Sequence, residues 1–189
     1  MFGDFTRAKV KMRLPIVLSR GEVSRLLGSL DPPWSLMGML LYGAGLRIME
    51  CMRLRVKDVD FAYRQLIVRE GKGGKDRVTV LPDSSIVPLK RHLAKIRCLF
   101  EQDRNDESPG VELPAALGRK YPNAGKEWGW FWVFPAPSHS KDPRTNIFRR
   151  HHVHETLLQR AVKEAVRAAH IAKPATPHTL RHSFAPDDL

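Results

Sequence analysis

The sequence predicts an α+β domain that is mostly helical and carries one small antiparallel sheet. Apolar residues recur at helical spacing over long stretches, for example residues 20–30 and 84–103. Between residues 56 and 82 the pattern changes to the alternation that is typical of short strands. The chain has 189 residues, 42% hydrophobic and 28% charged, which is a globular composition and enough to bury one core.

Residues that favour helix ends and turns set the expected boundaries. Ser19 and Glu22 match a capping box, and Asp31-Pro-Pro33 ends the helix that they begin. Gly43-Ala-Gly45 separates a helix that is apolar on all sides from the next one, which has Arg47 on its first turn. The expected helices cover residues 20–30, 34–42, 46–54, 84–103 and 153–171, and a last one opens at Pro177.

Three short strand candidates lie at residues 59–61, 66–68 and 78–81, and a glycine-rich turn over residues 71–75 joins the last two. Residues 104–150 are expected to be largely irregular, with one further strand over Trp128–Phe134. Residues 1–15 are expected to be a basic linker remnant that precedes the domain.

Cys51 and Cys98 fall among apolar residues, and we expect both to be reduced core residues.

The charge of the chain points to a polyanionic partner. Lys and Arg number 32 against 20 Asp and Glu, a formal net charge of +12 with a pI near 10.2. Nucleic acid is the first candidate and an acidic membrane surface the second. The apolar run Leu36–Leu46 is too short to cross a bilayer, and the first residues lack a signal-peptide pattern, so we expect a cytosolic protein without a membrane span.

The final predicted helix carries side chains suited to phosphate chemistry. Thr176 can cap it and Pro177 fits its first position. His178 and Arg181 then share one face, where an imidazole can move a proton beside a guanidinium that grips phosphate oxygens. The alternative is a capping histidine next to an arginine on a solvated face.

Two further motifs favour the phosphate interpretation: Gly43-Ala-Gly-Leu-Arg-Ile-Met-Glu50 and Gly71-Lys-Gly-Gly-Lys-Asp-Arg77. With His178-Thr-Leu-Arg181 they closely resemble the catalytic domain of tyrosine recombinases, the phage integrase family. The resemblance implies that Arg47 and Arg181 bind the oxygens of one DNA phosphate. It also implies that Lys72 protonates the leaving 5′-oxygen, that His178 handles a proton, and that the reaction passes through a 3′-phosphotyrosyl link.

This chemistry is physically coherent without a cofactor. Two bidentate arginines neutralise the charge that builds on the phosphorus, so neither metal nor nucleotide is expected. A lysine on a glycine-flanked turn can reach a groove as a general acid. The alternative for Lys72 is a solvated hairpin tip, and Glu50 is expected to be a structural partner of Arg47.

Segment 104–150 resembles the insertion of integron integrases, whose target is a folded single-stranded hairpin with unstacked bases. The resemblance places Trp130, Pro143, His151 and His152 at base-recognition positions, and aromatic or imidazole faces suit an unstacked base. Core packing is the alternative for the tryptophans. Four basic residues are also expected at the DNA, namely Lys75, Arg77, Arg149 and Arg150. The expected partner is a folded single-stranded or duplex recombination site, on which the chain forms a homo-oligomer.

One departure from the family pattern concerns the nucleophile. The family places a tyrosine after the helix of His178 and Arg181, whereas Tyr42, Tyr63 and Tyr121 all precede it. The amino-terminal domain that clamps the other side of DNA is also missing. Our hypothesis is a catalytic domain over residues 16–189, truncated and inactive by itself.

Two other functions remain as alternatives. A non-enzymatic basic module that binds DNA or RNA would need no convergence of Arg47, Lys72, His178 and Arg181, so convergence discriminates between the two. A zinc site is conceivable at His178 and His182, or at His151, His152 and His154. Neither group has an acidic or cysteine ligand beside it, so we expect no metal.

Overall fold

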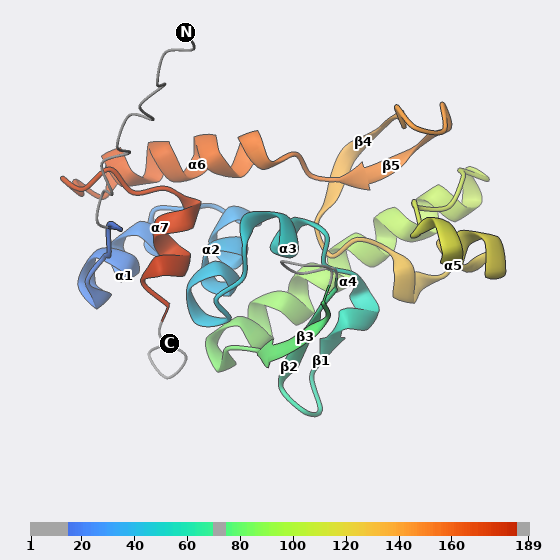
Figure 1. Cartoon of the computed structure of the whole chain (residues 1–189). Coiled ribbons are helices and arrows are strands. Elements are labelled where there is room, and N and C mark those ends of the chain that lie inside the picture. The colour runs from blue at the N-terminus through green and yellow to red at the C-terminus, as the bar shows by residue number, and fades with distance from the viewer. Residues whose placement is uncertain (1–14, 70–74, 185–189) are drawn as a thin grey trace, which may run out of the picture.

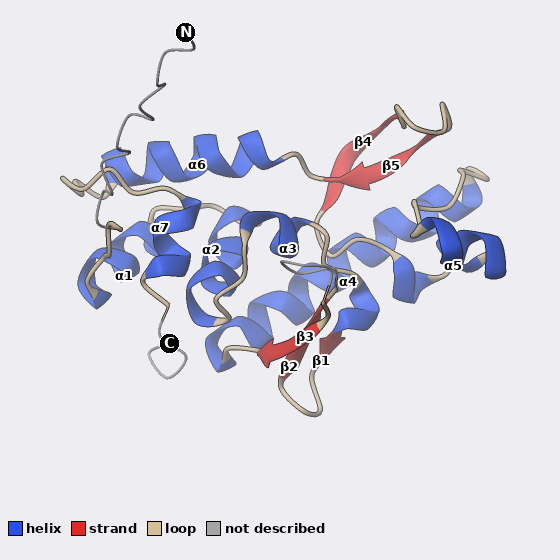
Figure 2. Cartoon of the chain, in the orientation of Figure 1, coloured by secondary structure: helices blue, strands red, loops and turns tan. Residues whose placement is uncertain are grey.

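The computed structural model describes residues 15–69 and 75–184, and residues 1–14, 70–74 and 185–189 lie outside this description. The described residues form a helical body with a three-stranded sheet at its lower edge and a two-stranded ribbon extending to one side (Figure 1). Helices predominate over strands (Figure 2). The prediction of a mostly helical α+β domain with a small antiparallel sheet is confirmed. Apart from Pro15, the expected linker remnant lies outside the described residues.

In chain order the helices are α1 (Arg20–Gly28), α2 (Trp34–Gly43), α3 (Ile48–Met52), α4 (Asp83–Asn105), α5 (Ala115–Lys120), α6 (Glu155–Ala168) and α7 (Pro177–His182). The strands are β1 (Val59–Asp60), β2 (Gln65–Val68), β3 (Arg77–Val80), β4 (Pro135–Lys141) and β5 (Phe148–His152). Three short 3-10 helices lie at Val56–Asp58 (η1), Ala124–Lys126 (η2) and Trp128–Trp130 (η3).

Helix α2 is the centre of the main core. Its residues are apolar on almost every side, and it contacts α1, α3, α4, α6 and α7. Met37, Leu40 and Leu41 are completely buried. At Gly38 an added Cβ would lie 2.6 Å from a Leu27 side-chain carbon, so glycine lets α1 approach closely. A helix without a polar face must be covered all round, and the neighbouring helices cover it.

The first sheet matches its predicted strands within one or two residues. Its order is β1-β2-β3, all antiparallel, with Leu66 paired to Thr79 and Val68 to Arg77. Leu66 and Val68 face the core, whereas Val78 and Val80 are exposed on the edge strand. The alternation of apolar residues therefore indicates the buried face in β2 but not in β3, where the valines are exposed.

The insertion is more regular than expected. It contains α5, two 3-10 helices and the β4–β5 ribbon, which projects away from the helical body (Figure 1). A second small core made of Ile96, Phe100, Val111, Phe131 and Trp132 attaches it to α4.

The predicted strand over Trp128–Phe134 is wrong. Residues Trp128–Trp130 form η3, because the rings of Trp128 and Phe131 both pack on Phe100, at centroid distances of 5.3 Å. In an extended strand, residues three apart point to opposite faces, so these two rings could not both pack on Phe100.

Arg150 was expected at the DNA, but the structure gives it another role. Its residue surface is only 5% exposed, and two of its nitrogens each lie 2.6 Å from a carboxylate oxygen of Asp103. Its remaining terminal nitrogen donates to the backbone carbonyls of Ala136 and Pro137. This closed pair ties the ribbon to α4.

The prediction that Cys98 is a core residue is also wrong. It lies on the exposed side of α4, whereas Cys51 is completely buried, as predicted. The burial of Cys51 raises the pKa of its thiol, which keeps the group protonated.

Breaking the pair of Asp103 and Arg150 should destabilise the protein strongly. Asp103→Ala leaves a buried guanidinium without its counter-charge, which typically costs about 3–5 kcal/mol. The matched control is Asp83→Ala, whose carboxylate pairs with Arg64 at the surface, where such pairs contribute less than about 1 kcal/mol. Urea unfolding of both variants measures the difference, and equal losses would contradict a structural role for Arg150.

Candidate active site

The candidate site is built around the carboxylate of Glu50, a side chain only 7% exposed. One oxygen, Oε1, accepts from Arg47 Nη1 at 2.7 Å. The other, Oε2, accepts from the Arg47 backbone N–H at 2.7 Å and from Arg77 Nη2 at 2.6 Å, and Arg181 Nη1 lies 3.6 Å from it. Three arginines from separate elements therefore converge on one carboxylate.

Local sequence explains how each arginine reaches this point. Arg47 is the N-cap of α3, and Glu50 at the third helical position returns a bond to its backbone. Arg181 projects from α7, which begins at Pro177 and is capped by the Thr176 hydroxyl, as predicted. Arg77 is the first residue of β3. Arg47 was expected on the first helical turn, so its place at the cap corrects that boundary.

The charges of the cluster are not balanced. Three guanidinium groups share one carboxylate, and their side chains are 36%, 34% and 26% exposed for Arg47, Arg77 and Arg181. Burial opposes ionisation of Glu50, but hydrogen bonds from Arg47 and the charges of Arg77 and Arg47 outweigh it and lower its pKa. Burial, and next the neighbouring charge of Arg47, lower the pKa of Arg181. This surplus of partly exposed positive charge favours an anion.

Gly45, two residues before Arg47, binds Arg181 through its backbone. Its carbonyl accepts a hydrogen bond from Arg181 Nη1, 136 residues further along the chain. Its φ of +61° lies in the left-handed region, and an added Cβ would lie 3.1 Å from the Phe184 ring. Glycine therefore suits this position, because another residue would be strained at this φ and would crowd the Phe184 ring. The sequence predicted a helix break at this residue and placed it in the Gly43–Glu50 motif, but it did not predict the bond to Arg181.

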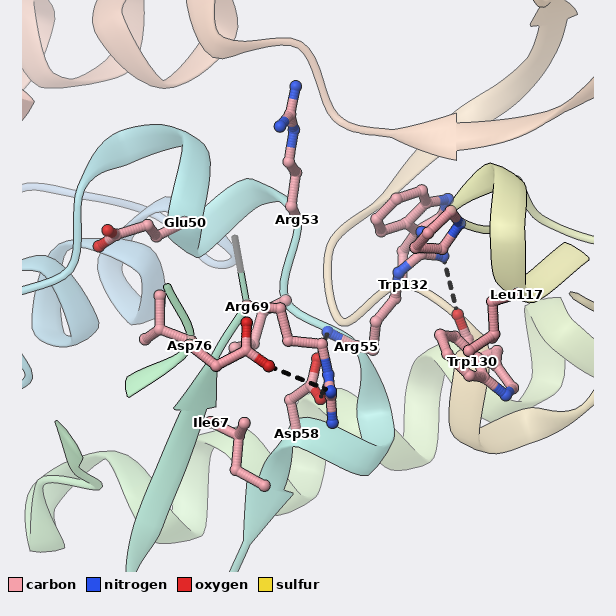
Figure 3. A pocket seen from close by; sticks show the side chains of 13 residues that line it. Glu50, Arg53, Arg55, Asp58, Ile67, Arg69, Asp76, Leu117, Trp130 and Trp132 are labelled. Atoms are coloured by element: carbon pink, nitrogen blue, oxygen red, sulfur yellow. Dashed lines mark hydrogen bonds and ion pairs between the residues drawn. The ribbon is translucent and has the colours of Figure 1, made fainter. Parts of the chain in front are cut away.

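Lys72 lies outside the described residues, so its predicted role stays a prediction. Arg69 Nε lies 2.6 Å from the buried carboxylate of Asp58, and Arg69 Nη1 lies 3.7 Å from Asp76 (Figure 3). The contact between Arg69 and Asp76 joins the residues on either side of the segment that carries Lys72. Lys75, the first described residue after that segment, is exposed.

His178 lies on α7 with Arg181 and is exposed. Its ring meets that of His182 edge-on at a centroid distance of 5.2 Å. His178 also lines a cavity of about 530 Å³ together with Ile48, the residue that follows Arg47. The structure therefore places the histidine and the residue that follows Arg47 at the same cavity.

A second cavity, of about 230 Å³, connects the cluster to the insertion. Glu50 and Arg53 form one end, and Trp130 and Trp132 form the other (Figure 3). The Arg55 guanidinium lies 3.1 Å from the Trp132 ring centroid and donates to the backbone carbonyls of Trp130 and Glu112. Arg55 thus fixes the insertion to the helical body, a role that the sequence did not predict.

Trp130 itself is half-buried, and one face of its ring is covered. The Lys57 ammonium lies 2.8 Å from the ring centroid. Burial, followed by the nearby charge of Arg69, lowers the pKa of Lys57. A base that stacks on Trp130 must therefore use the other face or displace Lys57.

The other predicted contacts of the insertion lie on the ribbon. Pro143 is exposed in the turn between β4 and β5, and the Arg149 side chain is 11% exposed beside Asp142. His151 and His152 end β5, and His152 meets Trp132 edge-on at 5.1 Å. Burial lowers the pKa of His152, which favours the neutral imidazole.

The described residues contain neither a candidate metal centre nor a candidate membrane span. No group of three or more His, Cys, Asp or Glu side chains within the described ranges could hold a metal ion. No helix among them has the length and apolar character needed to cross a membrane.

Comparison with known proteins assigns the family. The model of the phage integrase family matches residues 17–187, so the chain belongs to this family, which carries out site-specific DNA recombination. An integrase/recombinase of Escherichia coli is 52% identical over 182 residues, covering 96% of this chain and 54% of that protein. The tyrosine recombinase XerA of Thermococcus kodakarensis is 42% identical over 180 residues, covering 94% of this chain and 50% of the relative. The chain thus spans about half the length of these relatives.

Solved structures support the same fold. A crystal structure of XerA recombinase matches with a TM-score of 0.57 at 21% identity, covering 92% of this chain and 50% of that one. The site-specific recombinase XerH, solved on its difH substrate after cleavage, matches with a TM-score of 0.57 at 19% identity, covering 91% and 41%.

Replacing Gly45 should disturb the site more than the fold. Gly45→Ala places a side chain in a left-handed conformation, which costs about 1–2 kcal/mol, and presses a Cβ against Phe184. The shifted carbonyl should then release Arg181. Gly28→Ala is the control, since a Cβ there meets nothing within 4 Å. Thermal unfolding and DNA affinity measured together test this, and a Gly45→Ala variant equal to wild type in both would refute it.

Acid should destabilise the protein partly through Glu50. Because the folded-state pKa of Glu50 is lowered, its stabilisation is present above the unfolded value of about 4.3 and is lost as pH falls through the folded value. Glu50→Gln should therefore lose less unfolding free energy than wild type between pH 7 and pH 3. Denaturant unfolding at both pH values measures this, and parallel losses would show that the carboxylate gains nothing from its arginines.

Proposed function

We propose that this chain is the catalytic domain of a DNA recombinase of the integron integrase type, and that it binds the phosphate at which a DNA strand is exchanged. In this proposal Arg47 and Arg181 hold the phosphate oxygens. Lys72 supplies a proton to the leaving 5′-oxygen, and His178 handles a proton at the phosphate.

The observation that carries the proposal is the convergence of Arg47 and Arg181. Both approach the Glu50 carboxylate, and Arg181 also binds the carbonyl of Gly45, two residues before Arg47. A non-enzymatic module that follows the DNA backbone has no need to gather distant arginines at one point. The surplus positive charge suits the negative charge that grows on phosphorus in an in-line displacement.

The integron type is supported by the form of the insertion. It presents Trp130 and His152 near Arg55 and the cavity that leads to Glu50, so an unstacked base and a bound phosphate could belong to one strand. Lys75, Pro143, Arg149 and His151 remain proposed DNA contacts, and a homo-oligomer on DNA remains part of the proposal. Arg150 is not included, because its guanidinium is occupied by Asp103.

We further propose that the nucleophile is none of the tyrosines in this sequence. Tyr42 lies in α2 and is only 3% exposed. Tyr63 lies in the β1–β2 turn, at the end of β2 opposite the segment that carries Lys72, and Tyr121 caps the C-terminus of α5 in the insertion. Displacement requires an attacking oxygen about 3 to 3.5 Å from phosphorus, in line with the leaving group. A tyrosine supplied from elsewhere in the protein or from a partner chain fits the family chemistry.

The test is a double-mutant cycle on DNA binding. Arg47→Ala and Arg181→Ala should each weaken binding of a labelled hairpin by about tenfold or more, since a hydrogen bond to a charged group contributes about 1.5–3 kcal/mol. Their effects should be clearly non-additive, because both groups hold one phosphate. Arg97→Ala, which removes an exposed partner of Glu101, is the control. Affinity should also fall steeply with salt.

Two results would contradict the proposal. Small additive effects, equal to that of Arg97→Ala, would favour a basic module that only follows phosphates. On a nicked suicide substrate, a covalent band on a denaturing gel that disappears in Tyr63→Phe or Tyr121→Phe would move the nucleophile into this chain.

A further inference from the structure

The arginines of the described residues differ in how carboxylates neutralise their guanidinium groups. Arg150 is enclosed by the two oxygens of Asp103, a side chain only 3% exposed. Arg69 lies between two carboxylates, those of Asp58 and Asp76 (Figure 3). Arg77 instead shares Glu50 with two other arginines. An arginine with a purely structural role is expected to be neutralised, as Arg150 and Arg69 are.

The geometry of Arg77 leaves most of its guanidinium available. Glu50 touches it at one atom, Nη2, and is its only polar partner among the described residues. A guanidinium has five N–H donors in a rigid fork, so one bond uses a small part of its capacity. The side chain is 34% exposed, similar to the 36% of Arg47. The guanidinium groups of Arg77 and Arg47 thus donate to different oxygens of one carboxylate at similar exposure.

The single negative charge of the carboxylate cannot neutralise all three arginines. Its oxygens already accept from Arg47 Nη1, the Arg47 backbone and Arg77, and Arg181 remains at 3.6 Å. Like charges held this close repel one another unless an anion enters between them. A phosphate with several charged oxygens removes that repulsion and offers acceptors to each fork.

We propose that Arg77 is a third arginine of the reacting-phosphate site and binds the same phosphate as Arg47 and Arg181. This inference rests on the proposed function and extends it by one substrate-contacting residue. Glu50 then orients all three forks toward a single anion. Strand β3, which starts at Arg77, anchors this third ligand from the sheet side, whereas α3 and α7 supply the other two.

The test uses inorganic phosphate as the probe and the full chain. Side-chain nitrogen–proton resonances of the arginines are followed by NMR during the titration. The expected result is one saturable event in which Arg47, Arg77 and Arg181 shift with a common Kd. Arg97, which pairs with Glu101 on the surface, is the internal control and should not follow that curve.

Two substitutions separate binding from structural support. Arg77→Gln should weaken phosphate binding by about tenfold, the size expected for one charge-assisted hydrogen bond. Arg77→Lys keeps a positive charge that can pair with Glu50 but loses the fork. If Arg77 binds phosphate, Arg77→Lys should remain severalfold weaker than wild type while its thermal stability returns to that of wild type.

The outcomes distinguish this inference from the proposed function. If Arg47 and Arg181 shift saturably while Arg77 does not, and Arg77→Lys restores wild-type affinity, Arg77 only supports Glu50 and the inference fails by itself. If none of the three follows a saturable curve, the phosphate site fails and the inference fails with it.

Discussion

The carboxylate of Glu50 is the constraint on which the site depends. It brings together an N-cap arginine, an arginine from the sheet and an arginine from the last described helix. Without it, three guanidinium groups so close together would repel one another and turn toward solvent. With it, they are held in place but remain under-neutralised. Such preorganised positive charge is what phosphoryl chemistry needs, because the groups need not reorganise when negative charge develops.

The rest of the fold supports this cluster by fixing the elements that carry it. Helix α2 packs against both α3 and α7, so the two helices that bear Arg47 and Arg181 share one buried neighbour. Gly45 adds a direct link through its carbonyl. On the other side, Arg55 fixes the insertion through the carbonyls of Trp130 and Glu112, and Asp103 holds the ribbon through Arg150. Arg150 has a carboxylate of its own, whereas the arginines of the site share one.

Much of the fold was predictable because it depends on local patterns. The capping box at Ser19 and Glu22 and the cap at Thr176 are bonds between residues close in sequence, and the alternation along β2 matches its alternating burial. The arginines of the site were predicted from motifs that resemble a family. The sequence did not predict the pairing of Arg77 with Glu50, since β3 brings these residues together across 27 positions. It also did not predict that Arg150 pairs with Asp103 at 2.6 Å, because the two residues lie 47 positions apart.

The errors have a common physical origin. Residues Trp128–Phe134 are aromatic and apolar enough for a strand, but Phe100 on α4 gathers the rings and turns the chain into a 3-10 helix. Cys98 lies among apolar residues in sequence yet on the exposed side of α4. In both cases tertiary packing decides, and a local pattern carries no information about the partner.

The most direct measurement is a crystal structure of the chain soaked with tungstate, whose anomalous scattering locates a tetrahedral oxyanion without assumptions about DNA. The account predicts one strong peak within hydrogen-bond distance of the guanidinium groups of Arg47 and Arg181, on the side of the cluster away from the Glu50 carboxylate. A tungstate found only elsewhere on this basic surface, with Arg47 and Arg181 turned apart, would contradict the central claim that Glu50 holds them for one phosphate.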